Sequence, residues 1–274
     1  MIFDVKMLDS DGLFRRKERY VAGGHTIEIP ASLTCASVVS RDLVLIAPTL
    51  AALNVLDILA CDIQNAYLTA QYREKIWTVA GPEFGSDMGK IFIIKMALYG
   101  LKSSSATFCS LLAETLHKLN YVPSKVDPDV YMQPAVKPNG FEYYEYVLCY
   151  VKDILSISHC PNVTMDVIRA CFTFKDNKIH EPTDYLGAQL SKMKDKFGNE
   201  FWTMSSSKYC KADIKNVEER LALARNRLPT KCKTPMVTRY APYMDVTAEL
   251  KADGIQYFQE LIGVLRWACE IGGG

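Results

Sequence analysis

The chain has 274 residues, of which 49% are hydrophobic, and its 32 Lys+Arg and 31 Asp+Glu leave a formal net charge of +1. This composition is that of a globular protein and excludes a disordered, collagen-like or disulfide-scaffold chain. The near-neutral charge argues against a uniformly basic nucleic-acid coat but is compatible with a local basic patch.

Signals for secretion or membrane insertion are absent from the sequence. No apolar run reaches the length of about 18 residues that a membrane-spanning helix needs. Met1 is followed by Asp4 and Lys6, without the apolar core of a signal peptide. The nine cysteines are odd in number and none is spaced as CxxC, which is typical of reduced, buried thiols. The sequence therefore predicts an intracellular protein, cytoplasmic or nuclear, that is not secreted and has no membrane partner.

Turn residues and hydrophobic periodicity predict the elements of the first half of the chain. Residues 9–12 indicate a hairpin turn between two short strands, and Ser40 begins a helix over 41–54 in which Pro48 suggests a kink. The apolar face of this helix is expected at Leu43, Ile46, Ala47 and Leu50. The elements expected next are a buried strand over 56–63, strands over 75–79 and 91–95, and a helix over 102–119.

The second half is predicted to begin with a hairpin whose apolar strands, 143–150 and 154–158, flank Lys152 and Asp153. The elements expected after it are a helix over 162–174, strands over 183–190 and 200–204, a charged amphipathic helix over 207–227 and a last helix over 253–271. Strands and helices are interleaved without a regular βαβ repeat, and neither GxGxxG nor GxxxxGK[ST] is present. This order favours an α+β fold.

Two acids lie at the ends of apolar strands. Asp62 ends the strand over 56–63, and Asp153 lies at the tip of the predicted hairpin. A carboxylate at the end of a buried strand is costly unless it is solvated, paired or bound to a metal. Two such acids side by side could hold Mg²⁺, which prefers carboxylates together with substrate phosphates. Two ions about 4 Å apart would then serve nucleotidyl transfer, whereas two solvated strand ends are the alternative.

The motifs around these acids resemble those of copia-type retrotransposon reverse transcriptases, the RNA-dependent DNA polymerase domain of a Gag-Pol-like polyprotein. Residues 62–68 resemble motif A, residues 98–102 read LYGLK, and residues 150–153 fall where the family has its YVDD box. The other segments similar to family motifs are 17–24, 125–131, 185–187, 208–209, 234–236 and 261–265. These segments follow the family's order across nearly the whole chain.

The resemblance implies a fingers–palm–thumb polymerase with an antiparallel palm sheet and helices on one face. It makes Asp62 and Asp153 the catalytic residues and ligands of two Mg²⁺ ions. A reverse-transcriptase-like domain is expected over 1–240, with fingers and palm over 1–190 and a basic thumb-like part over 191–240. Residues 175–240 carry 14 basic and 8 acidic residues, which suits a part that tracks phosphates. Residues 241–274 are expected to be the truncated start of a following connection region.

The same resemblance implies an RNA template, a DNA primer and dNTP as partners. Lys17 and Arg19 would hold the triphosphate, since Lys and Arg are the usual phosphate binders. Tyr67 would be the gate under the incoming sugar, and Gly100 would let the template–nucleotide pair approach the backbone closely. The residues expected to contact primer or template are Tyr185, Leu186, Gly187 and Lys102. Each role has an ordinary alternative, such as a core aromatic, a solvated charge or a turn glycine.

Lys152 departs from the family pattern. The YVDD box reads Tyr150-Val151-Lys152-Asp153, so a lysine replaces the first acid, which is the family's principal metal ligand. A positive group there repels divalent cations and is expected to form an ion pair with Asp62. We therefore expect doubtful Mg²⁺ binding and an inactive or crippled polymerase. The alternatives are a non-catalytic nucleic-acid-binding relic of the domain and an unrelated soluble α+β binding domain.

Overall fold

The computed structural model describes residues 2–7, 14–24, 36–186, 188–198, 200–231, 241, 243, 246 and 248–272. The chain divides into two compact units, residues 1–181 and residues 182–274. The combination of helices with antiparallel sheets makes the fold α+β, as the sequence predicts. Across the described residues, no helix is both long and apolar enough to cross a membrane.

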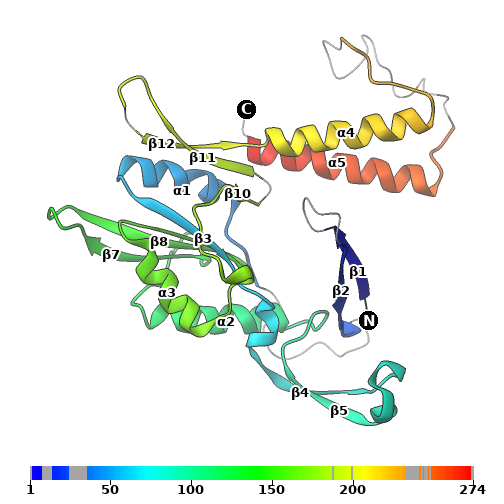
Figure 1. Cartoon of the computed structure of the whole chain (residues 1–274), viewed down its shortest axis with the longest axis horizontal. Helices are drawn as coiled ribbons and strands as arrows, with labels where there is room; N and C mark the ends of the chain where they lie inside the picture. The colour runs from blue at the N-terminus through cyan, green and yellow to red at the C-terminus, as the bar shows by residue number, and fades with distance from the viewer. Residues whose placement is uncertain are drawn as a thin grey trace. The chain divides into compact units, whose positions relative to one another are not determined.

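A five-stranded antiparallel sheet dominates the first unit (Figure 1). Its strands lie in the order β3, β9, β8, β7 and β6. The bounds are β3 Asp57–Asp62, β6 Val122–Pro123, β7 Val130–Val136, β8 Glu142–Tyr150 and β9 Asp153–Ser158. Every residue of β9 after Asp153 is buried. Because successive side chains of a strand point to opposite faces, both faces of the sheet must be covered at β9.

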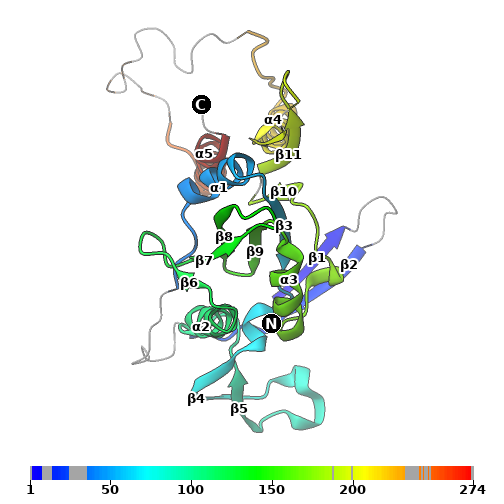
Figure 2. The same cartoon turned by 90° about the vertical axis from the view of Figure 1, so that its left-hand side faces the viewer.

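Helices cover the two faces of this sheet. Their bounds are α1 Arg41–Leu53, α2 Ser104–His117 and α3 Pro161–Cys171. Cys149 of β8 shares a core cluster with Phe108 of α2, whereas its neighbour Leu148 lies on the other face beside Ala47 of α1. Figure 2 shows α1 and α2 on opposite sides of the strands. The expectation of helices on one face is therefore wrong for α1, because both faces of the sheet are apolar and need cover.

The first helix is rotated from its expected orientation. The structure buries Val44, Ala47, Pro48 and Ala51. Of the four residues expected on its apolar face, Ala47 alone is among them, and Ile46 is 46% exposed. Small side chains let α1 approach β3 and β9 closely, so the larger residues Leu43, Ile46 and Leu50 lie to one side of the contact. The helix runs on through Pro48.

Two further hairpins belong to the first unit. β1 (Ile2–Met7) pairs with β2 (Phe14–Arg19), as the turn over 9–12 predicts, and β4 (Gln71–Val79) pairs with β5 (Ile91–Met96). β4 begins four residues before the strand expected over 75–79. A short 3-10 helix, η2 (Ala66–Thr69), follows β3. The strand β7 was not expected, since Pro134 and the mixed pattern of its residues hide the alternation that marks strands.

The second unit contains a three-stranded antiparallel sheet and two helices. The bounds are β10 Asp184–Tyr185, β11 Ala188–Lys194, β12 Glu200–Ser205, α4 Ser207–Leu223 and α5 Ala252–Gly272. The single strand predicted over 183–190 is in fact two strands, because Tyr185 pairs with Ala188 across a tight turn. The Arg220 guanidinium of α4 lies 3.9 Å from the centre of the Tyr257 ring of α5 and joins the two helices.

Candidate functional site

The two acids at the strand ends lie opposite each other. Asp62 ends β3, Asp153 begins β9, and the antiparallel register pairs them directly. Their side chains are 24% and 36% exposed. Cβ atoms of directly opposed residues are about 5 Å apart in antiparallel sheets. The register therefore brings both carboxylates within reach of one small group.

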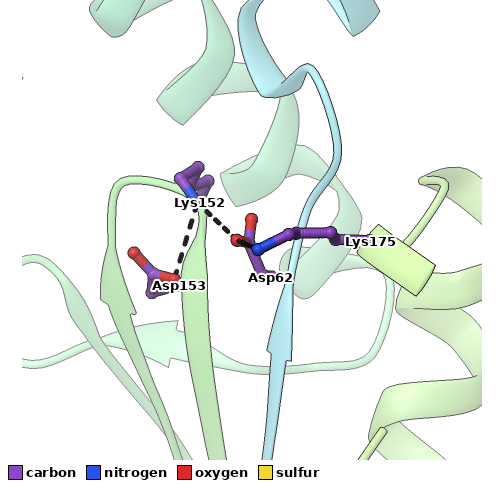
Figure 3. Close-up of polar contacts among 4 residues, drawn as sticks. All are labelled: Asp62, Lys152, Asp153 and Lys175. Carbon is purple, nitrogen blue, oxygen red and sulfur yellow. Dashed lines mark hydrogen bonds and ion pairs between the residues drawn. The ribbon is translucent and has the colours of Figure 1, made fainter. Parts of the chain in front are cut away.

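A two-residue turn places Lys152 beside these acids. Tyr150 pairs with Asp153, which leaves Val151 and Lys152 to connect β8 with β9. Val151 has a φ of 54°, a left-handed conformation that is strained for a β-branched residue. The Lys152 Nζ lies 2.5 Å from Asp62 Oδ2 and 3.8 Å from Asp153 Oδ1 (Figure 3). One ammonium group thus contacts both carboxylates, and the ion pair expected between Lys152 and Asp62 is present.

A second ammonium group reaches the same acid. The Lys175 Nζ lies 3.8 Å from Asp62 Oδ2, on the side away from Asp153 (Figure 3). A backbone bridge between Ile63 and Phe174 brings the segment after α3 to the end of β3. No motif in the sequence marks Lys175, because it reaches Asp62 only through this long-range pairing.

Two ammonium groups face the two carboxylates of the cluster. Burial raises the pKa of Asp153, the Lys152 ammonium opposes that shift, and the Asp62 carboxylate adds to it. Burial, and then the negative charges of the two acids, raise the pKa of Cys61 to about 12. Cys61 is therefore a neutral thiol at physiological pH and offers no thiolate to a metal. The Arg169 guanidinium opposes the shift of Cys61 and adds a further positive charge near the two ammonium groups.

Tyr67 lies on η2, a few residues beyond the end of β3. Its ring centre is 5.0 Å from that of Tyr99 and 6.3 Å from that of Phe108. The side chain is half-buried and packs against the main core cluster. These contacts fix the position of the ring beside the loop that follows β5.

Backbone contacts with the segment around Ala22 hold Gly100 in place. It has a φ of +90°, and a Cβ at this position would lie 2.1 Å from the carbonyl oxygen of Ala22. The Ala22 N–H donates to the carbonyl of Tyr99 at 2.8 Å, which keeps the two segments together. The glycine is thus required by an internal contact, whatever else approaches it. Lys102, in the same loop, is half-buried.

The other residues expected at the site lie on β2 and in the second unit. Lys17 and Arg19 lie on β2, but their side chains fall outside the described residues, as does Gly187 entirely. Tyr185, on β10 of the second unit, is 4% exposed. Leu186 occupies the turn between β10 and β11 with a φ of 50°, and its carbonyl accepts a hydrogen bond from the Trp267 indole at 3.1 Å.

Sequence comparison supplies the context of this cluster. A sequence model of the reverse transcriptase (RNA-dependent DNA polymerase) family matches residues 2–218. The chain belongs to this family. The match excludes the alternative of an unrelated α+β domain for most of the chain. No curated protein matches it.

Reverse transcriptases bind nucleic acid and nucleotides and normally use divalent metals, so the acidic pair must be tested as a metal site. Mg²⁺ is held by carboxylate oxygens that are free to face it. Here Asp62 Oδ2 is contacted by both Lys152 and Lys175. Within the described part of the chain, no group of three or more His, Cys, Asp or Glu residues could hold a metal ion. The residues present therefore do not fit a pair of Mg²⁺ ions.

Proposed function

We propose that this chain is a copia-type reverse transcriptase domain, derived from a Gag-Pol-like polyprotein, that no longer polymerises DNA. The observation that carries the proposal is the Lys152 ammonium, 2.5 Å from Asp62 and 3.8 Å from Asp153. It lies among the acids where the family's two metal ions would be needed. The domain is then a pseudoenzyme that keeps the surfaces for nucleic acid.

The repulsion that Lys152 adds can be estimated from Coulomb's law. Two unit charges about 4 Å apart near a protein surface interact by roughly 4 kcal/mol. Replacing an acid by Lys152 removes one attraction for a divalent ion and adds one repulsion. A loss of several kcal/mol is equivalent to several powers of ten in metal affinity or in rate, because about 1.4 kcal/mol corresponds to a factor of ten.

The other roles that the resemblance to copia-type reverse transcriptases implies are part of the same proposal. The five-stranded sheet would be the palm, the hairpins β1–β2 and β4–β5 the fingers, and residues 191–240 the basic thumb-like part. Tyr67 would lie under the sugar of a bound nucleotide, and Lys17 and Arg19 would meet its phosphates. Residues 1–240 would form the polymerase-like domain, and residues 241–274 the start of a connection region.

Primer extension tests the proposal. An RNA template annealed to a DNA primer is incubated with dNTP and Mg²⁺ or Mn²⁺, and the extended products are measured. We expect no extension by the wild type. Lys152→Asp should restore extension by at least about 100-fold over the wild-type background, since it removes the repulsion and returns a ligand. Lys152→Asp combined with Lys175→Ala should be more active still, because Asp62 is then free of both ammonium groups.

Lys178→Asp is the matched control. It makes the same charge change at an exposed lysine of the segment that carries Lys175, and it should leave the protein inactive. Robust extension by the wild type would refute the proposal. Binding of the labelled hybrid is measured in parallel by fluorescence anisotropy. If the wild type binds but does not extend, the loss lies in the chemistry and the nucleic-acid surface is retained.

A further inference from the structure

The hairpin β4–β5 has one apolar face that nothing in the first unit covers. Trp77 lies opposite Ile93, and Val79 lies opposite Ile91, in its antiparallel register. Trp77 is 61% exposed, and the other three side chains are each more than half exposed. Because alternate residues of a strand share a face, these four side chains form one patch, the outer face of the hairpin. A contiguous exposed apolar group of this kind marks an interaction surface.

The opposite face of the hairpin is partnered. The Phe92 ring centre is 5.2 Å from that of Phe84, which in turn is 5.7 Å from that of Tyr20. Ile76 and Ile94 pack against the main core cluster. Figure 1 shows the hairpin extending beyond the five-stranded sheet. The inner face therefore holds the hairpin to the first unit, and the outer face remains available to a ligand.

Three cations lie at the base of the hairpin. The register of the two strands shifts before Ile76, and the open groove there is lined by Arg73, Lys75 and Lys95. None of these three cations forms an ion pair with another residue that the structure describes. Lys75 comes two positions before Trp77, so its backbone lies about 7 Å from that of the tryptophan on the same face. The exposed indole thus has cations beside it.

The acid that lines the groove is Glu74. Its Oε1 accepts a hydrogen bond from the Ser103 hydroxyl at 3.0 Å, and its Oε2 accepts one from the Tyr72 hydroxyl at 3.2 Å. One carboxylate, already hydrogen-bonded within the chain, faces three cations. The groove therefore has an excess of positive charge, and its electrostatic complement is an anionic ligand.

We propose that the outer face of the hairpin binds single-stranded nucleic acid, with a base stacked on Trp77 and phosphates held by Arg73, Lys75 and Lys95. Exposed aromatic rings beside a positively charged groove are the means by which proteins bind single strands without sequence preference. A single strand supplies both the planar apolar group and the negative charge, whereas a duplex hides the faces of its bases. The proposal rests on the nucleic-acid surface that the proposed function retains, and not on the loss of polymerisation.

Fluorescence anisotropy with labelled oligo(dT) and oligo(rU) of about 12 nucleotides tests this binding on the full chain, and the two probes distinguish DNA from RNA. We expect binding of at least one probe, and an unlabelled blunt RNA–DNA hybrid should compete poorly. If neither probe binds, the inference is overturned, even where a hybrid with an overhang does bind and the proposed function stands. Extension of a primer by the wild type would refute the proposed function and leave this inference intact.

Substitutions of Trp77 test the stacking. Trp77→Ala should weaken binding by about 5- to 150-fold, the usual loss for one stacked base. Trp77→Tyr keeps an aromatic ring and should stay within about 5-fold of the wild type, whereas Trp77→Leu should be as weak as Trp77→Ala. Tyr144→Ala is the matched control, because Tyr144 is an exposed aromatic residue on β8 of the same unit. Wild-type affinity in Trp77→Ala or in Trp77→Leu would overturn the proposed stacking.

The salt dependence of binding tests the cations. Lys75→Gln combined with Lys95→Gln should reduce the slope of log K against log salt by about 1.4, since each phosphate contact to a single strand contributes about 0.7. Trp77→Ala should leave the slope unchanged. Lys118→Gln combined with Lys125→Gln removes two exposed lysines elsewhere in the first unit and is the control. Equal slopes in the two double variants would overturn the inference. So would a wild-type dimer in analytical ultracentrifugation that Trp77→Ala dissociates, since a second copy would then cover the face.

Discussion

At the scale of single residues, Gly100 shows how an internal contact can fix a residue that resembles a functional motif. The LYGLK segment and the segment around Ala22 lie far apart in the sequence, yet they meet through their backbones. The close approach leaves no room for a side chain at position 100. The motif therefore has a structural role in this chain that does not depend on any bound nucleotide.

Gly100→Ala should lower the free energy of unfolding of the first unit by more than the cost of placing alanine in a left-handed conformation. The comparison is with Gly140→Ala, since Gly140 has a similar φ of +84° but open space where a Cβ would lie. Alanine in a left-handed conformation costs about 1–2 kcal/mol, which both variants share. Gly100→Ala should cost at least about 1–2 kcal/mol more, through displacement of the 22–24 segment. Urea unfolding measures both, and equal losses would contradict the crowding.

Glu145 is a second residue whose surroundings decide a property, in this case the protonation state of its carboxyl group. Its Oε1 accepts hydrogen bonds from Ser158 at 2.6 Å and Tyr143 at 3.0 Å. Its Oε2 accepts from Gln133 at 2.8 Å and Tyr121 at 3.2 Å. Burial alone would raise the pKa of Glu145, but the four hydrogen bonds together hold it below the usual range. The ionised form is thus the one the fold stabilises.

A pH dependence follows from this shift. With a folded-state pKa below that of the unfolded chain, the stabilisation is present above the unfolded pKa and is lost as the pH falls through the folded one. Glu145→Gln should lower the free energy of unfolding by about 1–3 kcal/mol at pH 7. It should also flatten the loss of stability between about pH 5 and pH 3 in urea titrations. Glu142→Gln, at the exposed start of the same strand, is the control. If both variants kept the wild-type pH dependence of unfolding, Glu145 would not be the source of that dependence.

At the scale of elements, α1 is held by charges that match its dipole. A carboxylate, that of Asp127, accepts from the backbone N–H of Ser40 at the N-terminus. An ammonium group, that of Lys137, donates to the carbonyls of Asn54 and Val55 at the C-terminus. Ser40 takes the N-cap position as expected, but its own side chain makes no capping hydrogen bond. Asp127 and Lys137 flank β7, so one strand supplies both ends of the clamp.

Removing either charge should lower the free energy of unfolding by a similar amount. Asp127→Asn and Lys137→Met are each expected to lower the free energy of unfolding by about 0.5–2 kcal/mol. The two ends of a 13-residue helix lie about 20 Å apart. The double variant should therefore be additive within about 0.5 kcal/mol. Denaturant unfolding of the wild type, the two single variants and the double variant measures the coupling energy between the two ends of α1. A large coupling energy would contradict additivity and show that both ends depend on one shared rearrangement.

Most elements of the first unit could be predicted from the sequence, because each carries its own local signal. The apolar run before Asp62 and the paired runs around Lys152 define three strands of the sheet. The order of the strands, the position of β7 and the burial of the α1 face that carries Ala47 and Ala51 depend on contacts between distant segments. The same distinction holds at the candidate site. The pairing of Lys152 with Asp62 followed from motifs, whereas Lys175 arrives through the bridge between Ile63 and Phe174.

At the scale of the whole molecule, the two units differ in how much they bury. The main core cluster lies entirely within the first unit, from Cys61 to Phe174. In the second unit, α4 has no buried residue, and the large apolar residues Ile255, Phe258, Ile262 and Leu265 of α5 are all about half exposed. The family match runs across the boundary between the units. The stability of the chain therefore rests mainly on the sheet and its two layers of helices.

The clamp on α1 also has a consequence for the order of events during synthesis. The acid that caps its N-terminus lies 87 positions downstream of Ser40, and the lysine at its C-terminus lies 83 positions downstream of Asn54. At a translation rate of roughly 5–20 residues per second, about 4–17 s pass between the two. Contacts of such long sequence separation form late, because the loop must close first. The charged contacts at the two ends of α1 can therefore form only once residue 137 has been made, and its packing on β9 only once residue 158 has followed.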